Sequence, residues 1–198
     1  MKLEIVQTGN PVLRQQARPL SLTEIAGKEI QNLIKAMQTC MRAAPGVGLA
    51  APQVGFSLQL AVIEDRVEYH KDVLEEHLRE RDRRHVPFHV IINPTLIEIP
   101  GEKVEFFEGC LSVSGFSALV PRARGVRVEC LNEHGKKKVI EASGWYARIL
   151  QHEIDHLRGG LYIDRMHPKT FTSAENWAEF WKGKRVSEIR QTLGAGAY

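Results

Sequence analysis

The stretch QHEIDH, residues 151–156, contains the pattern His-Glu-x-x-His, and the interpretation of the rest of the chain starts from it. Residues four apart on an α-helix lie on the same face, so His152 and His156 can bind one metal ion through their ring nitrogens. Glu153 lies beside the first of these ligands, where its carboxylate can exchange a proton with water on the metal. The pattern predicts a metal-dependent hydrolase.

The residues around this stretch predict a buried helix. Ser143 can cap its start, and Gly159-Gly160 is a typical stop signal. Apolar residues cover most of the circumference in between, which is typical of a helix packed inside a protein. We therefore expect both histidines in a mostly apolar wall that shields metal chemistry from bulk water.

Composition and charge limit the class of protein. The 198 residues fit one domain, and the net charge of +3 is too small to indicate nucleic-acid binding. The three cysteines cannot all pair, which indicates a reducing compartment. The first 20 residues contain no long apolar run and resemble neither a signal peptide, a membrane span nor a transit peptide. We expect a bacterial cytoplasmic protein, with a trimmed organellar protein as the alternative.

Hydrophobic periodicity predicts the other elements. A core-packing helix is expected at about 28–42, and turns are expected at Asn93-Pro94 and Pro100-Gly101. A charge-dense insertion is expected at 64–86, and Ser173 is expected to cap an amphipathic helix whose aromatic residues pack on the core. Strands are expected at 58–63, 89–92, 95–99, 103–107, 118–120, 126–130, 138–141 and 161–163.

The sequence pattern leaves the third metal ligand open. Catalytic sites usually have three protein ligands and one open position. A metzincin would need a third histidine where Tyr162 stands, so that class is excluded. Glu175 would give a thermolysin-like peptidase cleaving internal peptide bonds, whereas Cys110 would supply a soft thiolate. A binding protein with a purely structural metal, closed by a fourth protein ligand, is a further alternative.

A glycine-rich segment at 46–55 contains G-x-G-x-x-A, which loosely matches a dinucleotide-binding fingerprint. That fingerprint needs a strand before it and a helix after it. Here a predicted helix precedes the segment and Pro52 interrupts it, so this interpretation is excluded. Small residues instead let the backbone approach a ligand closely, and the Gln53 amide can donate to an oxyanion.

Three stretches together resemble the signature motifs of the peptide deformylases. They are GVGLAAPQVG at 46–55, EGCLSV at 108–113 and QHEIDHLRG at 151–159, in the order found in that family. The resemblance covers about residues 1–170 and favours Cys110 as the third ligand. It implies an α+β fold in which antiparallel sheets pack around the buried central helix, with N- and C-terminal helices. It also implies a single catalytic domain at 1–198, with a C-terminal helix and loose tail at 168–198.

The resemblance implies removal of the formyl group from N-terminal formyl-methionine of nascent polypeptides, with release of formate. The partners would be formyl-methionyl peptides, met at the ribosome, and neither a specific nucleic acid nor a membrane. The cofactor would be one divalent metal, Fe2+ in cells, with Zn2+ or Ni2+ able to substitute. The resemblance implies Cys110, His152 and His156 as metal ligands and Glu153 as the residue that takes up and delivers the proton. It implies that Gln53 and the Leu111 N–H face the formyl oxygen. It also implies that Val47, Gly48 and Gly109 pair with the substrate backbone and that Trp145 and Ile149 line the methionine pocket.

The chain departs from the plainest bacterial pattern in two ways. The insertion at 64–86 is longer, and the stretches at 114–122 and 142–153 resemble the organellar type and its bacterial relatives. Arg148 stands where many bacterial forms have an aliphatic residue, which implies a different pocket shape. We also expect Asp155 to pair with Arg122 and brace the metal-binding helix.

Overall fold

The computed structural model describes residues 2–71 and 73–194, whose strands form two antiparallel sheets. The larger sheet has the order β1-β2-β3-β6-β7, and the smaller one has the order β4-β5-β8. The larger sheet consists of β1 (Gly48–Ala50), β2 (Leu60–Asp65), β3 (Val86–Glu98), β6 (Gly125–Leu131) and β7 (Lys137–Ser143). The smaller sheet consists of β4 (Lys103–Cys110), β5 (Val113–Ala123) and β8 (Thr172–Ser173).

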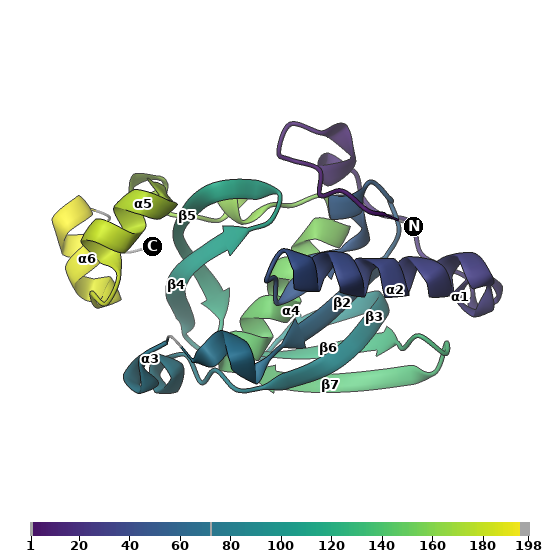
Figure 1. Cartoon of the computed structure of the whole chain (residues 1–198). Helices are drawn as coiled ribbons and strands as arrows, with labels where there is room; N and C mark the ends of the chain where they lie inside the picture. The colour runs from purple at the N-terminus through teal and green to yellow at the C-terminus, as the bar shows by residue number, and fades with distance from the viewer. Residues whose placement is uncertain (1, 72, 195–198) are drawn as a thin grey trace.

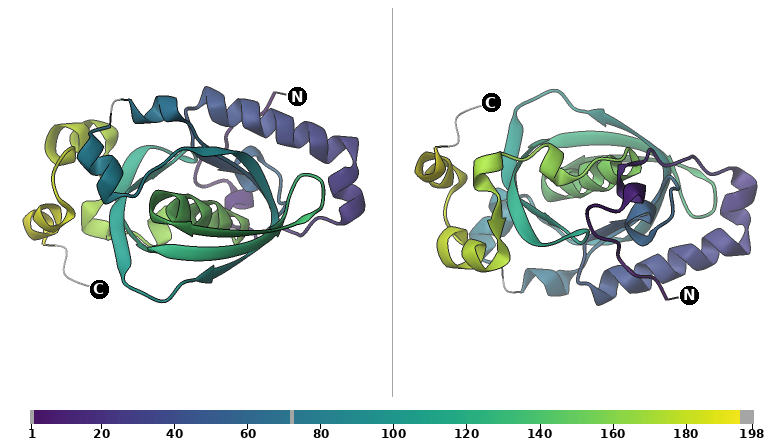
Figure 2. Two further views of the ribbon diagram at one scale, coloured as in Figure 1. Left: turned by 90° about the horizontal axis from the view of Figure 1, so that it is seen from below. Right: turned by 90° about the horizontal axis from the view of Figure 1, so that it is seen from above.

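Helix α4 (Gly144–Leu157) lies between the β4–β5 hairpin and the larger sheet (Figure 1), and the strands surround it when the molecule is viewed from below or above (Figure 2). The predicted fold class, antiparallel sheets around a buried central helix, is therefore confirmed. Ser143 occupies the cap position, but its hydroxyl donates to Asp82 at 3.0 Å instead of bonding the first turn. Apolar residues of α4 pack with residues of β2, β3, β6 and β7 in one core cluster.

Helix α2 (Lys28–Ala43) packs on β1, β2 and β3 of the larger sheet in a second core cluster. Its buried residues follow the helical spacing on one side, as predicted: Ile30, Leu33, Ile34, Met37 and Met41. A short helix, α1 (Leu22–Ala26), precedes it and starts at a capping box formed by Ser21 and Glu24. None of the helices in the described part of the chain has the length and apolar composition of a membrane span.

The predicted turn at Asn93-Pro94 is wrong, because β3 continues through it. The strand pairing is irregular between Ile92 and Thr95, and Asn93 has a positive φ of 51°. The Asn93 side chain accepts from the Leu20 N–H at 2.9 Å and donates to its carbonyl at 2.7 Å. A bulge accommodates proline without ending the strand, so the two expected strands are one.

The insertion at 64–86 begins and ends in the larger sheet and carries η3 (Val67–His70) and α3 (Glu75–Glu80) between β2 and β3. Its charges are not all solvated as expected. Asp65 is completely buried and accepts two hydrogen bonds from Arg83, both at 2.8 Å. The buried ion pair between Asp65 and Arg83 therefore joins the two ends of the insertion.

The chain after α4 differs from the prediction. The expected strand at 161–163 is wrong, since Tyr162–Asp164 form the 3-10 helix η4, whose Asp164 carboxylate accepts from the Leu161 N–H at 2.8 Å. Ser173 does cap a helix, which comprises α5 (Ala174–Asn176) and a π-helical turn, Trp177–Trp181. The sequence did not predict the last helix, α6 (Val186–Leu193), and most of the expected loose tail, 195–198, lies outside the described residues.

Candidate metal centre

Three side chains from two distant segments converge at one point of the interior. Cys110 ends β4, and its Sγ lies 3.3 Å from Nε2 of His156. That same nitrogen lies 3.3 Å from Nε2 of His152. In a tetrahedral zinc site, donors of these types are separated by about 3.3–3.6 Å. The cysteine and the two histidines thus fit a divalent metal ion.

Glu175, the alternative third ligand, lies elsewhere. It is exposed on α5, while the potential metal-binding group in the described chain consists of Cys110, His152 and His156. The structure therefore brings Cys110, the ligand that the resemblance favoured, to the two histidines. It leaves Glu175, the ligand of a thermolysin-like site, away from them.

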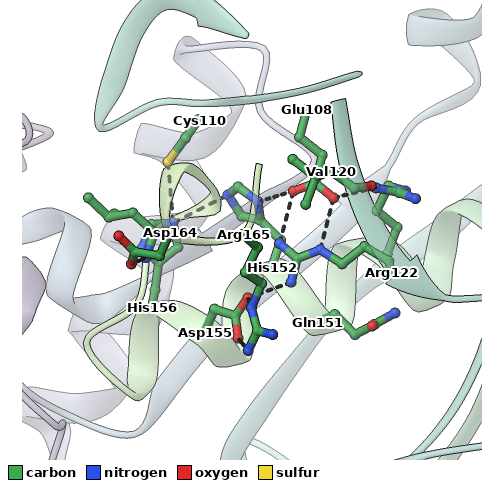
Figure 3. A network of polar contacts seen from close by, with 12 residues as sticks. Glu108, Cys110, Val120, Arg122, Gln151, His152, Asp155, His156, Asp164 and Arg165 are labelled. Atoms are coloured by element: carbon green, nitrogen blue, oxygen red, sulfur yellow. Dashed lines mark hydrogen bonds and ion pairs between the residues drawn. The ribbon is translucent and has the colours of Figure 1, made fainter. Parts of the chain in front are cut away.

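Glu108 orients the first histidine from behind (Figure 3). Its Oε2 lies 3.0 Å from Nδ1 of His152, and an ionised carboxylate can only accept, so Nδ1 donates. This hydrogen bond directs Nε2 of the ring toward Cys110 and fixes the tautomer that a metal ligand requires. Sequence reasoning missed Glu108; the available signal was a carboxylate two residues before the cysteine.

A buried network of charges surrounds Glu108. Arg122 donates two hydrogen bonds to it, both 2.9 Å long, and Arg148 donates a third at 2.6 Å. Burial alone would raise the pKa of Glu108, but the charge and hydrogen bonds of Arg122 outweigh it and hold that pKa well below its ordinary value. Arg122 also donates to Asp155, as predicted, and Asp155 accepts two further bonds from Arg165 (Figure 3). The network braces α4 against β4 and β5.

Glu153 and Gly48 are in close contact. Glu153 is buried, and its Oε2 has no hydrogen-bond partner among the described residues. A Cβ added at Gly48 would lie 2.3 Å from the other carboxylate oxygen, so only glycine fits this place on β1. Burial raises the pKa of Glu153 to about 7.

The Gln53 amide is fixed in orientation by its surroundings. It lies in the 3-10 helix η2 (Ala51–Val54), where its Oε1 accepts from the Ala50 N–H at 2.9 Å. Its NH2 group therefore faces Cys110 Sγ and the Ser112 hydroxyl, both at 3.4 Å. This side chain presents a donor, not an acceptor, at the metal centre.

A cavity of about 480 Å³ opens beside these groups. All residues that the sequence assigned to the site line it, except His156, which lies buried beneath. Trp145 and Ile149 of α4 line one side of the cavity with apolar surface, and Arg148 of the same helix also lines the cavity. The prediction that the aromatic residues of the C-terminal helix pack on the core is wrong for Trp177, which lines the cavity, and for Phe180, which is exposed.

Comparisons with known proteins agree with this arrangement. The family model described as polypeptide deformylase matches residues 2–172. Peptide deformylase 1A, chloroplastic/mitochondrial, of Arabidopsis thaliana is 49% identical over 173 residues, covering 87% of this chain and 64% of that protein. Peptide deformylase 3 of Streptomyces avermitilis is 43% identical over 192 residues, covering 97% and 84%. The chain thus spans under two thirds of the length of the plant relative but most of the bacterial one.

Solved structures give the same result. The Met-Ala-Ser bound class I type b peptide deformylase from Acinetobacter baumannii superposes with a TM-score of 0.74 at 32% identity, covering 84% of this chain and 99% of that one. The peptide deformylase from Thermotoga maritima gives a TM-score of 0.69 at 33% identity, covering 84% and 98%. With a matching family model, close relatives and a shared fold, the chain belongs to the polypeptide deformylase family.

Proposed function

We propose that this chain removes the formyl group from N-terminal formyl-methionine of peptides and releases formate. The observation that carries the proposal is the convergence of Cys110, His152 and His156 beside an apolar cavity that Glu153 and Gln53 also line. These groups supply, at one place, metal ligands, a proton carrier and an oxyanion donor.

The metal would be held by Cys110, His152 and His156. A bound divalent ion supplies a Lewis acid and lowers the pKa of water by several units. One soft thiolate and two imidazoles suit Fe2+, Zn2+ and Ni2+ better than Mg2+ or Ca2+. We propose Fe2+ as the ion in cells, with the other two able to substitute.

Glu153 would carry the proton. Its free Oε2 would take a proton from the attacking water and later give it to the departing amine nitrogen. Gly48 allows this carboxylate to lie directly against β1, which restricts its movement. We assign Glu153 the role of general base and then general acid.

Gln53 and the backbone N–H of Leu111 would stabilise the formyl oxygen as it gains negative charge. The Gln53 amide already presents its NH2 group to the metal centre, because its oxygen is engaged by Ala50. A donor that needs no reorientation is effective at this step, and losing one such donor typically costs roughly 3–4 kcal/mol of barrier.

The substrate would bind as an added strand. β1 and β4 are end strands of their sheets, and Gly48 of one and Gly109 of the other both line the cavity. An extended peptide can therefore pair with the backbone of one or both end strands, with Val47 also contributing. The methionine side chain would lie against Trp145 and Ile149. The related A. baumannii enzyme has a Met-Ala-Ser peptide bound, which supports a short peptide as ligand here.

We further propose that residues 1–198 act as one catalytic domain on nascent chains near the ribosome. Helix α4 packs on both sheets, so the halves of the chain depend on each other. Relatives are named from bacteria and from chloroplasts and mitochondria. The three unpaired cysteines favour a reducing compartment, and we place the protein in the bacterial cytoplasm.

The test is to incubate the full chain, purified anaerobically and loaded with Fe2+ or Ni2+, with formyl-Met-Ala-Ser and separately with casein. We expect formate release and no cleavage of casein. Casein cleavage without formate release would refute the proposal and favour a peptidase.

A further inference from the structure

We infer that Gln7 is a positioning residue, whose side chain holds the turn that presents the Leu111 N–H to the formyl oxygen. The inference rests on the proposed function and deepens it, because it names what keeps one of the two oxyanion donors in place. Gln7 lies 104 residues before Leu111, in the segment that precedes the 3-10 helix η1 (Pro11–Arg14). It is exposed and is not among the residues that line the cavity, so it acts through Leu111 and not on the substrate.

The turn that Gln7 contacts joins two strands at the metal centre. β4 ends at Cys110 and β5 begins at Val113, so Leu111 and Ser112 form the connection between them. Ser112 is buried, and its N–H donates to Cys110 Sγ at 3.4 Å. Each peptide group is planar and rotates as a unit, so the orientation of the peptide groups in this turn decides where the Leu111 N–H points.

The Gln7 amide forms two hydrogen bonds with this part of the chain. Its Nε2 donates to the Leu111 carbonyl at 3.0 Å, and its Oε1 accepts from the Ser114 N–H at 3.2 Å. The two partners agree on which end of the amide is the oxygen, because a carbonyl can only accept and an N–H can only donate. The amide therefore fixes the separation and the orientation of the two peptide groups, as a paired backbone residue would on a neighbouring strand.

The backbone on both sides of Gln7 adds two further contacts. The Thr8 N–H donates to the Ser112 carbonyl at 2.7 Å, and the Val6 N–H donates to the Gln53 carbonyl at 2.9 Å. One short segment thus bonds both parts of the chain that carry the proposed oxyanion donors. One part is η2, which follows β1 of the larger sheet, and the other is the β4–β5 turn of the smaller sheet. The segment therefore ties the two sheets together at the place where both donors must point at one atom.

Loss of the Gln7 amide should loosen the turn without releasing it. The two backbone contacts of the neighbouring residues do not depend on the side chain, so they persist in a variant of Gln7. An oxyanion donor is effective when it already points to the position where negative charge develops. A turn that can rotate loses this stabilisation in the transition state, whereas binding of the peptide in the ground state does not depend on it. The expected consequence is a lower kcat at unchanged KM.

The experiment compares the wild-type chain with Gln7→Met, Gln7→Glu and the matched control Gln16→Met, all loaded with the same metal. Methionine has the length of glutamine and lacks the amide donor and acceptor. Glutamate keeps an acceptor for the Ser114 N–H but places a second oxygen opposite the Leu111 carbonyl. Gln16 is an exposed glutamine further along the same N-terminal segment and is not among the described residues bonded to the turn.

Formate release from formyl-Met-Ala-Ser is measured over a range of peptide concentrations, so that kcat and KM are obtained separately. We expect both Gln7 variants to lower kcat about 5-fold to 20-fold, with KM within about twofold of the wild-type value. Gln16→Met should behave as wild type. Elemental analysis and urea unfolding of the same samples should show that the Gln7 variants keep their metal and remain folded under the conditions of the assay.

The possible failures can be told apart. An unchanged kcat in both Gln7 variants, a loss confined to KM, or the same loss in Gln16→Met would overturn the inference while formate release by the wild-type chain persists. A loss of metal that accounts for the lost activity would mean that the contact supports Cys110 and not the Leu111 N–H, and it would overturn the inference as well. Absence of formate release by the wild-type chain would refute the proposed function, and the inference with it.

Discussion

Replacing Gly48 with alanine would place a methyl group against the proposed proton carrier. The added Cβ would lie 2.3 Å from Oε1 of Glu153, 2.6 Å from Cδ and 2.8 Å from Cγ. Ordinary contacts of a Cβ begin near 3.4 Å, so the carboxylate must retreat by about 1 Å. Gly48 is not among the described glycines with positive φ, so its backbone accepts alanine. The clash therefore acts on the side chain and not on the local conformation.

The size of the effect follows from that displacement. A misplacement of about 1 Å can cost roughly 100-fold in rate, and a positioned acid or base contributes roughly 100-fold to 10,000-fold. We expect Gly48→Ala to lower kcat/KM about 100-fold to 1,000-fold, mostly in kcat. Overpacking a tight interior costs about 1–3 kcal/mol, so the free energy of unfolding should fall by that amount.

The assay is formate release from formyl-Met-Ala-Ser, with metal content and urea unfolding measured on the same samples. Metal content should be unchanged, because the clash is with Glu153 and not with the ligands. In a Glu153→Ala background the clashing carboxylate is gone, so Gly48→Ala should destabilise that variant much less. Equal destabilisation in both backgrounds, or near-normal turnover in Gly48→Ala, would refute the reasoning.

Three further predictions concern the metal and its support. Cys110→Ala should lose the metal, whereas Glu175→Ala should keep it, by elemental analysis after anaerobic purification; the reverse outcome would favour a thermolysin-like site. Glu108→Gln should weaken metal binding about 10-fold to 100-fold, because it weakens the hydrogen bond that orients His152; competition with a chelator measures this. Asp155→Ala removes one of the two carboxylates that buried Arg122 contacts and the carboxylate that Arg165 contacts, so it should lower the free energy of unfolding by about 1–3 kcal/mol; wild-type stability in urea would contradict it.

The elements that the sequence predicted best are those determined by local spacing. The metal-binding helix and α2 are long, periodic and punctuated, and both appear within a residue or two of their expected bounds. Features that depend on distant partners were predicted less well. Side-chain hydrogen bonds stabilise the bulge at Asn93 and the 3-10 turn at Tyr162, and hydrophobic periodicity does not reveal such bonds.

The sequence alone determined the pair of histidines, because their spacing on a helix places both rings on one face whatever surrounds them. It did not decide the third ligand, since a cysteine and a glutamate were both at plausible range along the chain. Only the tertiary structure brings Cys110 within 3.3 Å of His156, because β4 must pack across α4 for the two to meet. The same packing places Glu108 behind one histidine. Contacts between segments far apart in the chain depend on how sheets and helix pack, and spacing within one segment carries no information about that packing.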